Sequence, residues 1–130
     1  MSSERPVQEQ VALQTAASEK VKQLLTQSQQ AMNEASWTTA RDGFLQASHW
    51  LPQAAQVHHN LALCQLALGK PEAAKASADK ALSLNPNLWQ SCMVKGNALK
   101  ALKQAEAADV AYAQVLQMQP GNGEALLARA

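Results

Sequence analysis

The chain has 130 residues, the size of a single domain, and its 11 Lys and Arg nearly balance its 10 Asp and Glu. This balance argues against a nucleic-acid-binding protein and against a polybasic membrane-binding surface. Alanine makes up about a fifth of the chain, and no apolar run approaches the roughly 20 residues that cross a bilayer. We therefore expect a soluble, helical protein of the cytoplasm.

Residues 1–20 are polar, with Val7, Val11 and Leu13 as the large apolar side chains after the initial Met. They lack the apolar central run of a secretory signal. Two forms remain open for this segment. It is either a frayed tail or, from about Glu9 onward, an extension of the first helix, because no residue after Pro6 breaks a helix.

An internal repeat follows. Pro52, Pro86 and Pro120 are separated by two equal intervals of 34 residues. Counting back from each proline reaches an alanine after twelve residues and a small residue after twenty-four. These residues are Ala40, Ala74 and Ala108, and Ser28, Ala62 and Gly96. Several such columns in phase over three copies indicate a repeated structural unit.

Each copy is predicted to hold two helices, and the middle copy shows this best. The apolar spacing predicts a first helix over 55–68, which ends at Gly69 because glycine accepts a left-handed conformation. Pro71 suits the first turn of a second helix over 71–84. Pro86 then disfavours helix at the residue before it, so the unit closes there.

The turns between the two helices of the first and third copies differ in sequence from the turn at Gly69 of the middle copy. Ser36 is a candidate cap for the second helix of the first copy. The third copy has no strong helix breaker at Lys103–Gln104. Ala74 and Ala108 are expected where the two helices of a unit cross closely, since a side chain larger than methyl does not fit there.

This pattern resembles the tetratricopeptide repeat, whose period is 34 and whose signature includes A-x3-F and a later Pro. Ala40-x3-Phe44 and Ala108-x3-Tyr112 carry the signature, whereas the early Trp of the family is replaced by Leu24, His58 and Cys92. The resemblance implies an all-α fold, a right-handed superhelix or solenoid of helix-turn-helix units. The three units would be 21–54, 55–88 and 89–122.

Residues 123–130 begin like the first helix of a fourth unit and would leave Leu126 and Leu127 partly uncovered. Two interpretations remain open. Either this short helix docks on the third unit, or the chain has been cut from a longer protein, which we favour. The two leucines also suggest weak self-association through this end.

The sequence shows no catalytic constellation. His58 and His59 are adjacent, so on a helix they diverge by about 100° and do not readily share a metal ion. The glycines form no phosphate-binding loop, and we expect neither a cofactor nor a metal. Cys64 and Cys92 lack metal-binding spacing and are predicted to be buried free thiols.

One face of each first helix repeats with the spacing i, i+3, i+7, i+10. The family resemblance implies that this face lines a concave groove in which peptides bind. The groove would offer amides, apolar side chains and weak positive charge at its ends. The candidate residues are Lys22, Leu25, Gln29, Met32, Gln56, His59, Leu63, Leu66, Gln90, Met93, Asn97 and Lys100. For Leu63 and Leu66, packing against the next first helix is the alternative.

Two specific sites of the family are poorly matched. The resemblance would place a carboxylate clamp for acidic chaperone tails at positions of which only Asn60 carries a matching residue. Those positions are Leu25, Gln29, Asn60, Gln90 and Val94. An asparagine ladder would fall on Thr26, Asn60 and Val94, again with one match.

We therefore predict a non-enzymatic adaptor that binds a peptide or partner segment of another protein in its groove. The alternative is the N-terminal segment of a multidomain enzyme, such as a glycosyl-, sulfo- or methyltransferase. The sequence names neither the partner nor the pathway.

Overall fold

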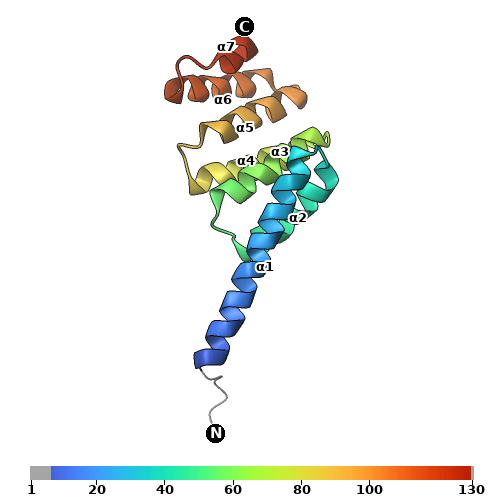
Figure 1. The fold of residues 1–130 in the computed structure, drawn as a ribbon. Coiled ribbons are helices and arrows are strands. Elements are labelled where there is room, and N and C mark those ends of the chain that lie inside the picture. The colour runs from blue at the N-terminus through green and yellow to red at the C-terminus, as the bar shows by residue number, and fades with distance from the viewer. Residues whose placement is uncertain (1–6, 130) are drawn as a thin grey trace.

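The computed structural model describes residues 7–129, and within them it contains seven α-helices and no strand. Consecutive helices form hairpins, and the hairpins stack on one another along the chain (Figure 1). The helices are α1 (Val7–Asn33), α2 (Trp37–Trp50), α3 (Ala55–Ala67), α4 (Pro71–Leu84), α5 (Trp89–Ala101), α6 (Ala105–Met118) and α7 (Gly123–Arg129). The predicted second helix of the middle copy is confirmed as α4, and its first helix ends one residue earlier than expected.

The turn inside each hairpin is built in the same way. Gly69 has a positive φ of 73°, and Ala35 and Lys103, one period away on either side, have φ values of 58° and 63°. In each turn the next N–H donates to the carbonyl five residues earlier, as Lys70 does to Gln65 at 2.9 Å. The third corner therefore forms without a glycine, because its neighbours hold Lys103 in the left-handed conformation. Ser36 precedes α2 but makes no side-chain cap hydrogen bond.

Small residues let the two helices of a hairpin approach closely. A Cβ atom at Gly96 of α5 would lie 2.5 Å from Cε1 of Tyr112 on α6, so only glycine fits there. In the first hairpin, a Cβ at Gly43 would overlap the Ser28 hydroxyl in the same way. Ala74 and Ala108 are buried, as the sequence predicted, and so is Ala40 at the equivalent position of the first unit.

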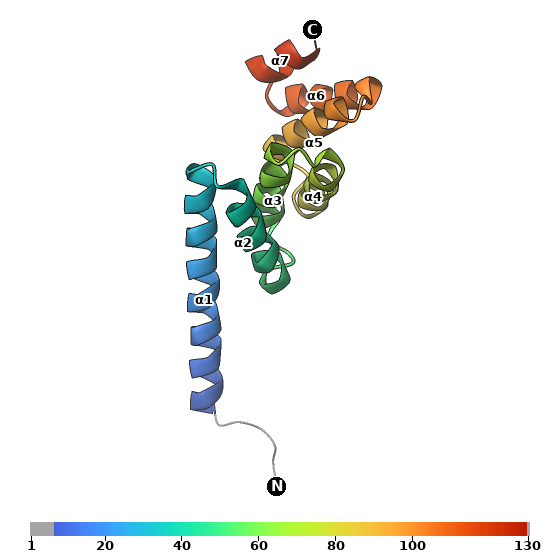
Figure 2. The ribbon, with the colours of Figure 1, turned by 90° about the vertical axis from the view of Figure 1, so that its right-hand side faces the viewer.

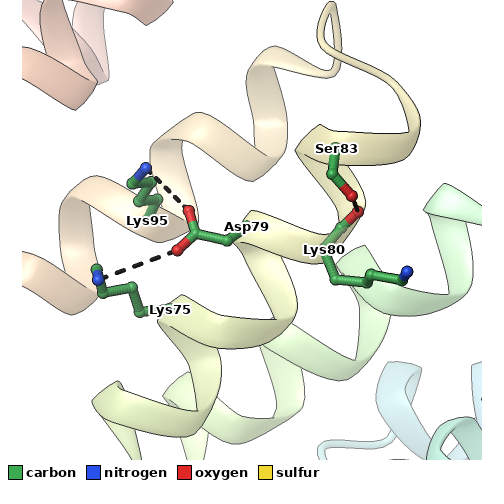
Figure 3. A network of polar contacts seen from close by, with 5 residues as sticks. All are labelled: Lys75, Asp79, Lys80, Ser83 and Lys95. Carbon is green, nitrogen blue, oxygen red and sulfur yellow. Dashed lines mark hydrogen bonds and ion pairs between the residues drawn. The ribbon is translucent and has the colours of Figure 1, made fainter.

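Ion pairs join neighbouring hairpins. Lys95 Nζ on α5 lies 2.8 Å from Asp79 Oδ1 on α4, and Lys75 approaches the other carboxylate oxygen of Asp79 (Figure 3). Arg129 of α7, 34 residues after Lys95, also pairs with an aspartate of the preceding helix, Asp109 of α6 at 2.9 Å, which lies one turn before the position equivalent to Asp79. Such exposed ion pairs add little stability. The start of α7 at Gly123, 34 residues after the start of α5 at Trp89, places α7 where a fourth first helix would begin.

The two ends of the stack differ. The first half of α1 is helical from Val7 and extends beyond α2, with no described helix beside it (Figure 2). At the other end α7 docks on α6 and buries Ala125, yet Leu126 and Leu127 remain 51% and 79% exposed. Self-association through these leucines stays a prediction. Residues 1–6 and residue 130 lie outside the described part of the chain.

The buried alanines provide a direct test of the helix crossing. Ala74→Leu and Ala108→Leu are each expected to lower the free energy of unfolding by about 1–3 kcal/mol, because the added carbons have no space between the helices. Chemical denaturation measures this change. Ala76→Leu, on the exposed side of α4, is the matched control and should be nearly neutral. Equal stabilities for all three variants would refute the close crossing.

The left-handed turns provide a second test. Gly69→Ala is expected to destabilise the fold by about 1 kcal/mol, because it adds a Cβ to a residue with positive φ. Lys103→Gly should change stability in the opposite direction, by about 0.5–1 kcal/mol, since it relieves the same strain. Lys103→Ala removes the charge but keeps the strain and serves as the control. Thermal and denaturant unfolding report each change.

Candidate functional site

A large cleft lies between α1 and α3, the first helices of the first two hairpins. Its volume is about 680 Å³. Phe44 of α2 contributes to its wall, together with Leu51 and Ala54 from the connection that leads into α3. The cleft is open because α1 and α3 hardly touch, whereas α3 packs directly against α5. We call this space the first cleft.

The first cleft combines an apolar wall with amide groups. Leu25 and Leu51 are the large apolar side chains at the surface of the cleft, and the buried Phe44 and Val57 close it at its base. The amides come from both flanking helices: Gln29, Gln30 and Asn33 on α1, and Gln56 and Asn60 on α3. The amides are hydrogen-bonded along their own helices: Gln56 Nε2 donates to Asn60 Oδ1 at 3.1 Å, and Gln29 Nε2 donates to Asn33 Oδ1 at 3.0 Å. Gln30 Nε2 donates to Glu34 Oε1 at 3.2 Å. None of the lining residues is charged.

A second cleft of about 380 Å³ adjoins the first. Leu25 and Leu51 line both clefts and form the partition between them. The second cleft is otherwise lined by α1 residues from the part that begins to extend beyond α2, and by Trp50, which is 57% exposed. Its one charged lining residue is Lys22, whose Nζ lies 3.5 Å from Glu19 Oε1.

The predicted groove residues of the first unit are the ones that meet at these clefts. Leu25 and Gln29 line the first cleft together with Gln56 from the next unit, and Lys22 lines the second. Met32 is half-buried and packs on the core beneath Phe44. In the third unit, Gln90 and Lys100 are exposed but line neither cleft.

At two candidate positions the structure differs from the expectation. His59 and Met93 are only 6% and 5% exposed, so their side chains are not free to meet a ligand. His59 Nδ1 is joined to Ser91 Oγ on α5 by a 2.8 Å hydrogen bond. Met93 lies in the core that includes Ala125 of α7. His59 is buried because α5 packs against α3, and Met93 is buried in a core that α5 shares with α6 and α7.

Three further candidates are partly engaged in packing. Leu63 and Leu66 pack against a core that includes Val94 of α5, which is the alternative weighed for them. Asn97 is half-buried, and its Oδ1 accepts a 2.7 Å hydrogen bond from the Tyr112 hydroxyl. Leu63 and Leu66 thus help to close the space between α3 and α5, whereas the space between α1 and α3 remains open as the first cleft.

Sequence reasoning missed several lining residues. Gln30 and Asn33 flank the chosen helix face, and the spacing rule used one position per turn. Leu51 and Ala54 belong to a connection between hairpins, and Trp50 ends α2. A spacing rule for helices does not reach connections. The apolar character of Trp50 and Leu51 just before Pro52 was the available signal.

The two cysteines lie in the buried part of the structure. Burial raises the pKa of the Cys64 thiol to about 11, and it raises the pKa of Cys92 as well. Both cysteines are buried and free, as predicted. Within residues 7–129 no three His, Cys, Asp or Glu side chains gather so as to hold a metal ion. None of the helices in this range is long and apolar enough to span a bilayer.

Comparison with known families gives two matches that together span just over half of the chain. Tetratricopeptide repeat models match residues 55–88 and residues 90–122. The chain belongs to the tetratricopeptide repeat (TPR) family. The all-α right-handed solenoid expected from the sequence is thereby confirmed, since solved TPR structures share the fold.

Curated relatives match part of the chain. The human FK506-binding protein-like protein is 37% identical over 71 residues, which are 55% of this chain and 20% of that protein. Its mouse counterpart is 35% identical over the same length. The matched stretch thus spans about a fifth of the length of these relatives.

Solved TPR structures superimpose on most of the chain. The first TPR of Spaghetti (RPAP3), bound to the HSP90 peptide SRMEEVD, has a TM-score of 0.79 and 23% identity over 85% of this chain and 90% of that one. The Arabidopsis OM64 TPR domain has a TM-score of 0.83 and 20% identity, with coverages of 85% and 92%. The Thermobaculum terrenum O-GlcNAc transferase gives 0.75 and 20% over 83% of this chain and 21% of the enzyme.

The buried His59 makes the stability of the TPR stack depend on pH. Burial lowers the pKa of His59 below its ordinary value of 6.5, because the charged form is poorly solvated. The unfolded chain therefore binds a proton more readily than the folded one. Stability should be full above about pH 6.5 and fall as the pH drops below this value.

Denaturation between pH 5 and pH 8 measures this slope. His59→Met, which places the residue of the equivalent position 93 there, should remove the contribution of this site. His58→Gln leaves His59 in place and is the control, so it should retain the slope. A slope that is unchanged in His59→Met would show that another group is responsible.

Proposed function

We propose that this chain is a non-enzymatic protein-interaction module that binds a peptide segment of a partner in the groove between its first helices. The observation that carries the proposal is the first cleft, about 680 Å³ in volume, where an apolar wall faces a row of amides. Amides can pair with the backbone of an extended peptide, and the apolar wall can receive a side chain. The cytoplasm suits such a module, since both cysteines are free thiols.

The relatives support binding of a partner segment without naming it. The RPAP3 domain was solved with an HSP90 peptide, and the second TPR domain of human RPAP3 with an HSP70 peptide. The acidic tails in these peptides need cations, however, and the clamp positions of this chain are Leu25, Gln29, Asn60, Gln90 and Val94. With no cation among them, we propose a different class of segment for this groove.

The alternative is that the chain is the TPR segment of a larger enzyme. This alternative is supported by the similarity to an O-GlcNAc transferase, of which the matched stretch covers 21%. Sequencing the complete transcript distinguishes the two. A transferase domain in the same reading frame would support the alternative.

Groove binding can be tested with a peptide chosen by display on the full chain. In a titration of the isotopically labelled protein, the resonances that shift should belong to Thr26, Gln29 and Asn60. Gln29→Arg, on the exposed surface of α1, should weaken binding about tenfold, because it places a large charged group in the cleft.

The matched control is Val110→Arg, which makes a similar change on the exposed side of α6, where the residue lines neither cleft. This variant should bind the peptide normally. If the shifts gather around Val110, or if both variants bind equally well, the groove is not the binding site.

A further inference from the structure

The two clefts form one trough along α1. The α1 residues that line the second cleft are Ala17, Ser18, Val21, Lys22 and Leu25. Each of them precedes by eight positions one of the α1 residues that line the first cleft, which are Leu25, Thr26, Gln29, Gln30 and Asn33. Eight residues of α-helix advance about 12 Å. Eight residues also turn about 80° around the helix axis. The trough therefore winds around α1 and holds two apolar recesses about 12 Å apart along the axis, separated by the partition of Leu25 and Leu51.

The second recess lies where α1 begins to extend beyond α2 (Figure 2). Trp50, at the end of α2, lines this recess together with Val21 and Leu25 of α1, and it is 57% exposed. A large aromatic side chain next to aliphatic ones gains from being covered by another apolar group.

The charge of the trough restricts what it can bind. The first cleft has no charged lining residue, and the charge of the single lysine of the second cleft, Lys22, is balanced by Glu19 at 3.5 Å. A charged segment would gain at most a weak, solvent-exposed ion pair there, and it would give up water around its charges at the apolar surface. A segment without charges loses little favourable hydration when it enters the trough.

We propose that this trough binds an extended, uncharged segment of a partner protein that inserts two large apolar side chains, one into each cleft. The inference rests on the proposed function and specifies its ligand. In an extended chain, residues i and i+4 point to the same side and are separated by about 13 Å, close to the spacing of the clefts. The two apolar residues are therefore four positions apart, and the amides of α1 and α3 hold the backbone near the first of them.

The test uses ten-residue peptides with acetylated and amidated ends, displayed with random sequence and selected on the full chain. Selection should enrich peptides without charges that carry Leu, Met or an aromatic residue at positions i and i+4. Replacing either apolar residue of a selected peptide by Ser should weaken binding about tenfold. Replacing a neutral residue between them by Glu should also weaken it.

A double-mutant cycle assigns each anchor to its cleft. Trp50→Ala should weaken binding about tenfold, and this loss should be coupled to one of the two apolar residues of the peptide only. Thr26→Glu in the first cleft should be coupled to the other. Val110→Ala is the control, since Val110 has an exposure similar to that of Trp50 and lines neither cleft.

The outcomes separate this inference from the proposed function. Enrichment of acidic tails, or a groove-bound peptide that is indifferent to Trp50→Ala, would overturn the two-anchor trough while leaving groove binding intact. If every selected peptide binds outside the groove, both proposals fail.

Discussion

The structure depends on how closely the two helices of each hairpin can approach. Gly96 lies so near the ring of Tyr112 that a single methyl group would not fit, and Ala74 is fully buried at the equivalent crossing of α3 and α4. The small residues bring the backbones together, and the larger side chains fill the spaces on either side. Because a hairpin of this kind cannot bury its apolar face alone, hairpins stack, and stacking produces the elongated shape and the surface between first helices.

The same stacking determines where the molecule is open. Between the second and third hairpins, α3 and α5 pack together, and the hydrogen bond between His59 and Ser91 lies inside that contact. Between the first and second hairpins, α1 stands apart from α3, and the apolar wall and the amides remain accessible. The candidate site is thus a place where the repeat is imperfect. A perfectly regular array of these units would have closed it.

The distribution of charged side chains determines the chemical character of this opening. Many of the charged residues of the chain are on outer helix surfaces, where several of them pair as Asp79 does with Lys95. The trough along α1 is lined mainly by amides and apolar groups, and this composition is the basis for the neutral extended ligand that we propose. The α1 residues from Ala17 to Leu25 supply one side of the second cleft.

The sequence by itself determined the period, the helices and the family, because these depend on local spacing. Pro71 and Gly69 predicted one corner correctly, and the repeated alanines predicted the crossings. The third corner carried no glycine, and only the packed structure shows Lys103 in the left-handed conformation. The sequence likewise did not predict which of the groove residues are accessible and which are buried. Leu25, His59 and Met93 occupy the same position in successive units, yet Leu25 lines a cleft while the other two are buried. Whether such a side chain is accessible or buried depends on how closely the neighbouring helices pack over its position. That packing is a property of the tertiary structure and not of the residue itself.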